Sequence, residues 1–268
     1  MNGQITFAVL AAAALAACAQ ERPITGLPAL SADALAEKFS CPSSGTPPPA
    51  SQVRGGLEVD GTCILDGVTV NGGITVDAGG HLQFQSSTVN GGISVLQCGE
   101  LDVNATTNGA GVPTGTSATI NGGIVINASA VCTFPAFSDA DIRTAQINGG
   151  ISVTGSYNNV TTPLICSNGI SGDVTMDNVV APQFFIGDPD GTFGCPGNTI
   201  TGALSVSNST VFEVESNSVG GSVSLSGSTL QLNGNTIGGS LLCSNGTVIL
   251  PGEASDPSGN TVQGANTC

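Results

Sequence analysis

A short motif repeated along the chain constrains the fold more than any other feature of the sequence. The motif is a β-branched residue, any residue, glycine, any residue, and then two mostly apolar positions separated by one residue. Successive copies start between 18 residues apart (Val219 to Ile237) and 31 residues apart (Val89 to Ile120). A repeat of this length predicts a solenoid. The nine copies begin at Val70, Val89, Ile120, Ile147, Ile170, Ile200, Val219, Ile237 and Val262.

The apolar positions alternate with polar ones, which is typical of a strand with one buried face. A second alternating pair follows in the regular coils, and a coil of 18 to 19 residues leaves no room for a helix. We therefore predict an all-β parallel β-helix of about nine to ten coils. We expect it to be right-handed, because stepping six residues from Val219 reaches Leu225 and then Gln231, which breaks the hexapeptide rule of left-handed β-helices. The second pairs expected to face inward are Leu82/Phe84, Leu101/Val103, Cys132/Phe134, Phe212/Val214 and Leu230/Leu232.

The sequence before the repeats has a different character. Residues 1–18 read as a signal peptide, whose end Leu15-Ala-Ala-Cys18 resembles the bacterial lipobox, so Cys18 is the predicted lipidation site. The alternative is ordinary secretion with cleavage near Ala17 or Ala19. Residues 19–52 are proline-rich and predict a tether and cap with one short helix over 31–39, and residues 53–268 form the β-helix. We expect an exported protein that is either secreted or membrane-anchored through the lipid alone.

The coils resemble known families of β-helices. They resemble the right-handed β-helices of the pectate-lyase-like superfamily and the shorter-coiled, polymer-forming bactofilins. They most resemble secreted bacterial repeat proteins with no assigned activity, in residues 63–84, 234–243 and 259–268. The resemblance covers about residues 53 to 268. It implies a right-handed β-helix and leaves the activity open, because this fold carries enzymes, adhesins and scaffolds.

Charge and residue usage exclude several classes of partner. The net charge is −15, with four Lys and Arg in the whole chain, so neither nucleic acid nor an anionic membrane surface is an expected partner. A zinc site is not expected either, because the chain has one His and no Cys-x-x-Cys. No cofactor is predicted.

Eight cysteines remain when Cys18 is set aside, and an even number in an exported chain indicates disulfides. Cys243 and Cys268 stand at the same position of the motif in consecutive coils. Residues at one such position form a column along the β-helix, so we expect these two to pair. Cys166 and Cys195 precede their motifs by four and five residues, and are also expected to stack. Sequential pairing would then join Cys41 to Cys63 and Cys98 to Cys132. The alternative for Cys63 and Cys132 is unpaired burial, since both fall in the inward column of Leu82.

No set of catalytic residues emerges from the sequence. Asp139, Asp141 and Arg143 are expected on an inserted loop, as a local ion pair or as a calcium-assisted lyase site of the kind that the pectate-lyase resemblance implies. Asp188 and Asp190 lie in the turn sequence Asp-Pro-Asp-Gly; they form either a turn, a weak candidate metal site or, least of all, a catalytic pair. His81 follows Gly79-Gly80 and is expected to be an exposed turn residue.

Two polar columns are candidate surface features. Asn71, Asn90, Asn121 and Asn148 occupy one corner of four successive coils and predict a hydrogen-bonded ladder, with sugar or ice binding as the alternative. A threonine row runs beside it, broken by Gln146, Gly169 and Ser218, and rows of this kind occur in ice-binding solenoids. Its members are Thr69, Thr88, Thr119, Thr199, Thr236 and Thr261.

These features favour a non-enzymatic surface or periplasmic protein that contacts polysaccharide, a cell-surface protein or another copy of itself. The first alternative is a carbohydrate-active enzyme, a polysaccharide lyase or glycosidase, that uses acids of the segments 104–119, 135–146 and 186–199. The second alternative is a self-assembling scaffold or an ice-binding protein.

Overall fold

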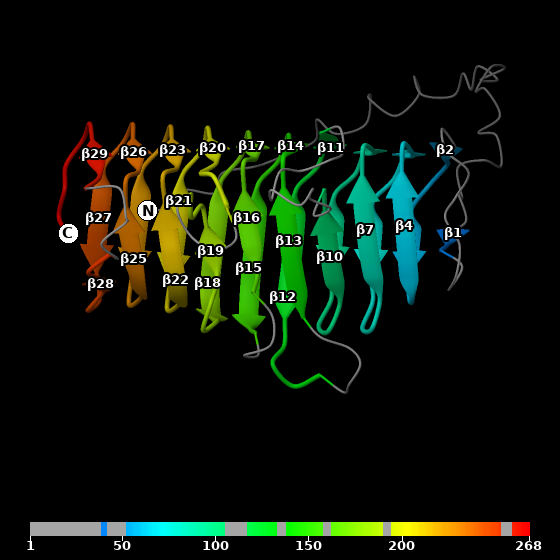
Figure 1. Cartoon of the computed structure of the whole chain (residues 1–268), viewed down its shortest axis with the longest axis horizontal. Coiled ribbons are helices and arrows are strands. Elements are labelled where there is room, and N and C mark those ends of the chain that lie inside the picture. The colour runs from blue at the N-terminus through cyan, green and yellow to red at the C-terminus, as the bar shows by residue number, and fades with distance from the viewer. Residues whose placement is uncertain are drawn as a thin grey trace, which may run out of the picture. The chain divides into compact units, whose positions relative to one another are not determined.

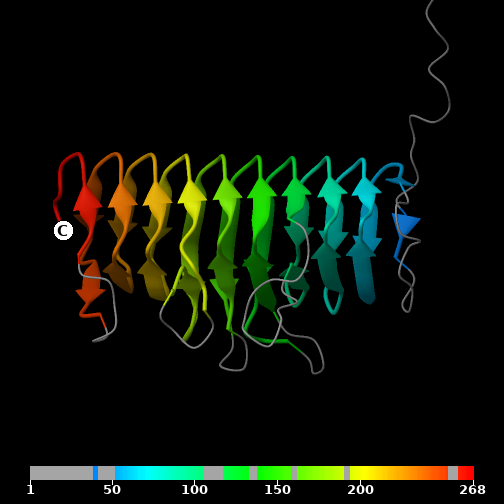
Figure 2. The same ribbon diagram turned by 45° about the horizontal axis from the view of Figure 1, so that its top comes forward.

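The computed structural model describes residues 39–41, 52–104, 117–132, 138–157, 162–189, 194–252 and 259–268. All of them belong to one compact unit, Glu37–Cys268. They form a parallel β-helix whose coils follow one another along a single axis (Figures 1 and 2). The predicted all-β, parallel β-helical architecture is therefore confirmed. None of the described segments forms a helix with the length and apolar character needed to cross a bilayer.

Each regular coil contributes three strands, one to each of three parallel stacks. Sheet 1 holds the short strands that begin the sequence motif, and it has ten members. They are β2 (Gln52–Val53), β5 (Thr69–Val70), β8 (Thr88–Val89), β11 (Ala118–Ile120), β14 (Ala145–Ile147), β17 (Gly169–Ile170), β20 (Thr199–Ile200), β23 (Ser218–Val219), β26 (Thr236–Ile237) and β29 (Thr261–Val262).

Sheet 2 holds the strands that end the motif. Its members are β1 (Phe39–Ser40), β3 (Leu57–Val59), β6 (Ile74–Val76), β9 (Ile93–Val95), β12 (Ile124–Ala128), β15 (Ile151–Ser156), β18 (Val174–Val180), β21 (Leu204–Ser207), β24 (Val223–Ser226) and β27 (Leu241–Ser244). Sheet 3 holds the second alternating segments. Its members are β4 (Thr62–Asp66), β7 (His81–Gln85), β10 (Glu100–Val103), β13 (Asp139–Arg143), β16 (Leu164–Cys166), β19 (Phe185–Ile186), β22 (Thr210–Glu215), β25 (Thr229–Asn233) and β28 (Val248–Leu250).

Residues of one sequence column stack directly on one another. Val76 pairs with Val95, and each is at most 1% exposed, while the residues between the inward positions face outward. The period-two pattern therefore forms one continuous apolar core along the axis. The first coil has the same pattern, because Val53 pairs with Val70 and Leu57 with Ile74. This tenth motif copy, Val53 to Val59, was missed in the sequence.

The glycine at the third position of the motif is invariant because the backbones of two consecutive coils approach each other closely there. Gly122 has no positive φ, but a Cβ atom added to it would lie 2.6 Å from the backbone nitrogen of Gly92. Gly149 meets Gly123 in the same way. Any larger residue would push consecutive coils apart at this corner.

A buried asparagine ladder at the corner between sheets 3 and 1 was not predicted. Its members are Asn168, Asn198, Asn217, Asn235 and Asn260, and the first four are at most 2% exposed. The Asn217 Oδ1 accepts hydrogen bonds from the backbone nitrogen and from Nδ2 of Asn198, and the Asn217 Nδ2 donates to the carbonyl of Ile186. The side-chain amides thus satisfy backbone groups at a corner where no strand pairing can do so.

Four disulfides join the pairs predicted by sequential pairing: Cys41–Cys63, Cys98–Cys132, Cys166–Cys195 and Cys243–Cys268. Cys63 is both inward and paired, so burial and pairing are not alternatives for it. These bonds are consistent with an oxidising compartment.

Some local assignments were wrong. Cys132 follows β12 outside sheet 3, and Ala140 and Ile142 of β13 fill the inward positions of that coil instead, because an insertion precedes the strand. The register of β22 shifts between Thr210 and Glu213, so Val211 faces the core in place of Phe212. Phe39 begins β1, and the rest of the predicted helix, with Cys18, lies outside the described residues.

The two asparagine ladders should differ in their contribution to stability. We expect Asn217→Ala to lower the free energy of unfolding by about 3 kcal/mol, because it leaves buried donors and acceptors without partners. Asn121→Ala, in the exposed ladder, should cost less than about 1 kcal/mol. Urea-induced unfolding measures both; equal losses would contradict the structural role assigned to the buried ladder.

Candidate functional site

Strand register brings polar residues from three successive coils onto the outer surface of sheet 3. His81 of β7 pairs with Glu100 of β10, and Glu100 pairs in turn with Asp139 of β13. Asp102 pairs with Asp141 one outward position further along. The core-facing residues between them, such as Leu82 and Leu101, fix this orientation. We call the outward set His81, Glu100, Asp102, Asp139, Asp141 and Arg143 the acid face.

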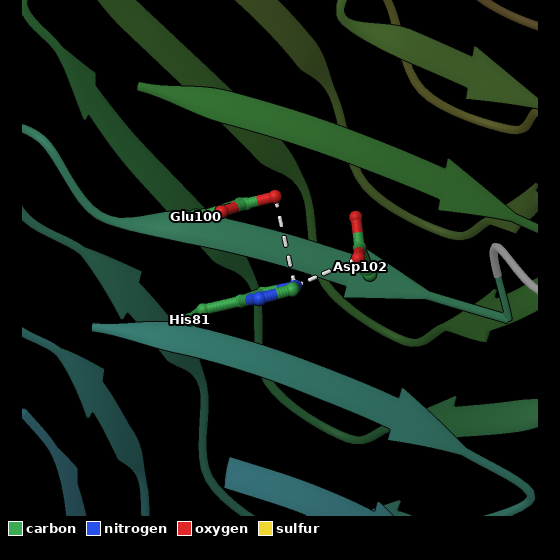
Figure 3. Close-up of side chains that lie close together, drawn as sticks. All are labelled: His81, Glu100 and Asp102. Atoms are coloured by element: carbon green, nitrogen blue, oxygen red, sulfur yellow. Dashed lines mark hydrogen bonds and ion pairs between the residues drawn. The ribbon is translucent and has the colours of Figure 1, made fainter. Parts of the chain in front are cut away.

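His81 lies at the centre of a contact with two carboxylates (Figure 3). Its Nε2 lies 2.8 Å from Oδ2 of Asp102 and 3.6 Å from Oε1 of Glu100. The three side chains are between 23% and 33% exposed, so solvent and a ligand can reach them. The expectation of an exposed turn residue was wrong, because His81 is the first residue of β7 and points along the outer surface of the sheet.

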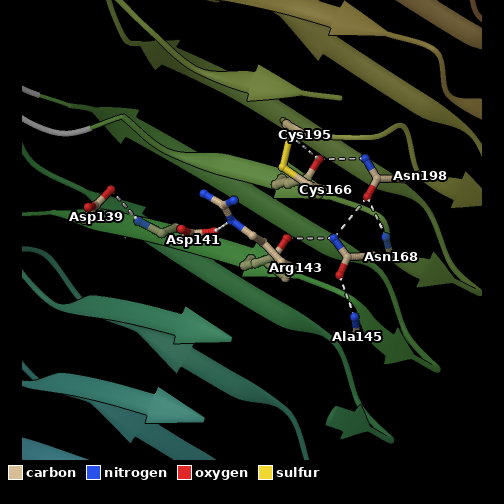
Figure 4. A network of polar contacts seen from close by, with 11 residues as sticks. Asp139, Asp141, Arg143, Ala145, Cys166, Asn168, Cys195 and Asn198 are labelled. Atoms are coloured by element: carbon tan, nitrogen blue, oxygen red, sulfur yellow. Dashed lines mark hydrogen bonds and ion pairs between the residues drawn. A yellow bond between two sulfur atoms is a disulfide. The ribbon is translucent and has the colours of Figure 1, made fainter. Parts of the chain in front are cut away.

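Asp139, Asp141 and Arg143 lie on β13, so their assignment to an inserted loop was also wrong (Figure 4). The Arg143 Nε donates to Oδ1 of Asp141 at 2.6 Å, and Oδ1 of Asp139 accepts from the backbone nitrogen of Ala140. The expected local ion pair is present. On β13 this ion pair lies beside Glu100 and Asp102 of the preceding coil, a proximity that the sequence did not predict.

Burial and like charge both act on the carboxyl groups of the acid face. Burial, and to a smaller extent the nearby carboxylates of Asp102, Glu100 and Asp141, raise the pKa of Asp139 to about 7, against the Ala140 hydrogen bond, which lowers it. Burial also raises the pKa of Glu100 and of Asp141. The hydrogen bond to the Asp102 carboxylate raises the pKa of His81 above its ordinary value of 6.5, although burial opposes it. The face therefore holds protons near neutral pH.

A second acid cluster lies further along sheet 3. Asp188 follows β19, and Glu213 and Glu215 belong to β22. One carboxylate oxygen from each lies within 4.8 Å of the others, and all three residues are buried. Asp188 is buried and forms an isolated antiparallel bridge with Cys195, and Asp190 lies outside the described residues. The sequence missed Glu213 and Glu215, although their positions on either side of the inward Val214 give an outward orientation.

Among the described residues, two groups of side chains could hold a cation. His81, Glu100 and Asp102 bring one nitrogen and two oxygen atoms within 4.8 Å of one another, and Asp188, Glu213 and Glu215 bring three oxygen atoms as close. The first group is partly exposed and the second is buried. An all-oxygen set suits a hard cation such as Ca²⁺, whereas a set that includes imidazole also suits transition metals.

The exposed asparagine ladder is present as predicted. The Nδ2 of Asn90 donates to Oδ1 of Asn71 at 2.9 Å, and Asn121 and Asn148 continue the series at 2.8 Å and 2.7 Å. The threonine row is also in register, since Thr69 pairs with Thr88 and Thr88 with Thr119 in sheet 1. The ladder hydrogen bonds support a structural role for these asparagines.

The raised pKa values of the acid face predict how stability depends on pH. A carboxyl whose pKa is raised on folding disfavours the folded state as it ionises, so stability falls as pH rises from about 4 to about 7. The raised pKa of His81 acts in the same direction above pH 6.5, because deprotonation removes its ion pair. We expect Tm to fall by roughly 5 °C between pH 4.5 and 7.5.

Asp139→Asn should remove much of this fall, whereas Asp66→Asn, on the outer side of β4, should leave it intact. Thermal unfolding followed by circular dichroism across this pH range measures the effect. An equal fall in wild type and Asp139→Asn would show that Asp139 is not the group responsible.

Comparison with known proteins finds no matching family model, no similar curated protein and no similar solved structure.

Proposed function

We propose that this protein is an exported, non-enzymatic β-helix that binds polysaccharide on the acid face. The observation that carries the proposal is the convergence of His81, Glu100, Asp102, Asp139 and Asp141 from three successive coils onto one partly exposed surface. A coil needs only small polar residues outside its core. Four carboxylates in adjacent positions repel one another, so their grouping favours a binding role over a stabilising one.

The arrangement suits an extended ligand. The coils repeat at a spacing of about 4.8 Å, so polar side chains recur along the axis of the rod at regular intervals. The carboxylates provide hydrogen-bond acceptors for hydroxyl groups, and Arg143 adds a donor. A polymer with many hydroxyl groups can therefore make repeated contacts across β7, β10 and β13.

Charge selects among polysaccharides. The chain has a net charge of −15, and the acid face contains four carboxyl groups. An acidic polymer would be repelled, whereas a neutral polymer or one that carries amino groups would not. We therefore expect a neutral or amino-containing polysaccharide as the ligand.

The cellular setting belongs to the same proposal. Four disulfides agree with folding outside the cytoplasm. The lipobox-like sequence ending at Cys18 supports attachment to a membrane through a lipid, with residues 19–52 as the tether. In this arrangement the β-helix would be held at a cell surface or in the periplasm.

Binding can be tested by affinity electrophoresis of the purified protein in gels that contain neutral, amino-containing or acidic polysaccharides. We expect retardation by a neutral or amino-containing polymer, and a loss of affinity of at least about tenfold in the double variant Glu100→Gln/Asp102→Asn. The double variant Asp60→Asn/Asp66→Asn removes the same charge outside the acid face and should bind like wild type. Absence of retardation by every polymer, or equal retardation of both variants, would contradict the proposal.

A glycoside hydrolase is the second candidate, and the pKa of Asp139 favours it. A carboxyl that stays protonated near pH 7 can act as a general acid, and Asp102 lies diagonally across from it, with Cα atoms about 8 Å apart by strand geometry. Mass spectrometry of the same polymers after incubation distinguishes the two candidates. Release of fragments that stops in Asp139→Asn, with binding retained, would replace the non-enzymatic proposal by hydrolysis.

A further inference from the structure

Three buried carboxylates outside the acid face form the most unusual charge arrangement in the described part of the chain. Asp188 is 3% exposed, Glu213 is 4% exposed and Glu215 is fully buried. One oxygen of each lies within 4.8 Å of the other two. Carboxylates placed this close in a buried site repel one another strongly unless a cation or protons compensate their charge.

The local fold holds these side chains in place. Val214 faces the core, so Glu213 and Glu215 on either side of it point outward from β22. Asp188 follows Gly187, which has a φ of 75° and is packed so closely on the Glu215 carbonyl that a Cβ atom would overlap it. Backbone hydrogen bonds between Asp188 and Cys195 pin the segment. The disulfide to Cys166 then fixes it to sheet 3.

Apolar side chains lie beside the cluster, in a part of the sequence that has no basic residues. Leu164, Phe185 and Phe212 pack with the disulfide beside the cluster, on the outside of sheet 3. The sequence has no Lys, Arg or His after Arg143. Arg143 itself lies on β13, three strands and therefore about 14 Å from β22, and bonds to Asp141.

A separate observation at Gln231 also indicates a ligand. Gln231 lies on the neighbouring strand β25, where it pairs with Glu213 of β22. Its side chain points outward, as that of Glu213 does, because Leu230 and Leu232 on either side face the core. It is 8% exposed, and its buried Oε1 has no hydrogen-bond partner among the described residues. A buried amide oxygen without a partner costs free energy in the folded state. Beside three carboxylates, it is suited to accept a cation.

We propose that Asp188, Glu213, Glu215 and the Gln231 amide oxygen bind one Ca²⁺ ion. The donor set consists of oxygen alone, and Ca²⁺ takes six to eight oxygen ligands in flexible geometry, whereas Mg²⁺ keeps several waters and Zn²⁺ prefers nitrogen and sulfur. The bound ion offsets two of the three negative charges of the cluster and fastens Asp188 to sheet 3. The site goes beyond the proposed polysaccharide binding and does not depend on it.

Thermal unfolding of the disulfide-bonded protein in EDTA and in about 10 mM CaCl₂ tests the site. With a Kd near 10⁻⁴ M, which is usual for extracellular calcium modules, we expect Ca²⁺ to raise Tm by about 5 °C. Glu215→Gln should abolish this rise, and in EDTA it should be as stable as wild type or more stable, because it removes a repulsive charge. Asp66→Asn should keep the full rise.

Calorimetric titration of wild type with CaCl₂ gives a second readout that needs no variant, and one ion per chain is expected. Gln231→Leu should weaken Ca²⁺ binding roughly tenfold through the loss of one ligand. No heat of binding up to 10 mM Ca²⁺, or an equal rise of Tm in wild type and Glu215→Gln, would overturn the proposal. The same holds if the cluster binds protons instead, which would appear as a Tm that ignores Ca²⁺ and falls less with rising pH in Glu215→Gln than in wild type.

Discussion

Each coil of this protein depends on its neighbours for backbone hydrogen bonds. All strand pairs in sheets 1, 2 and 3 are parallel and join one coil to the next, so a coil that shifted by one residue would turn its apolar side chains outward and lose its pairing. Register between coils is therefore the constraint on which the core, the corners and both acid clusters depend.

The corners show how the chain meets this constraint where strands end. At one corner, glycines such as Gly122 allow two backbones to approach without a side chain between them. At another, Asn198, Asn217 and Asn235 supply side-chain amides that pair with backbone groups of adjacent coils. At the last coil, the disulfide Cys243–Cys268 joins β27 to the end of the chain. These devices keep the coil spacing constant.

Much of the fold could be predicted from the sequence, because register repeats the same residue type at the same position. The columns that contain Val76 and Val95 predicted sheet 2, and Asn71 and Asn90 predicted a ladder that is present. The candidate site could not be predicted in the same way. The intervals around β13 include insertions, so the spacing did not reveal that Asp139 stacks on Glu100. Glu213 lies close to Asp188 because the register of β22 shifts and because Asp188 bridges to Cys195. Neither feature repeats along the sequence, so neither could be predicted from the motif.

The register that builds the core also brings polar side chains of different coils together on the surface. His81 and Asp102 are 21 residues apart in sequence and meet because β7 and β10 pair one coil apart. This stacking of strands from successive coils creates the acid face. Since His81 is the single histidine of the chain, its titration by NMR gives one resonance and the most direct test. We expect a His81 pKa above 6.5 that falls in Asp102→Asn. A pKa at or below 6.5 that does not change in this variant would contradict it.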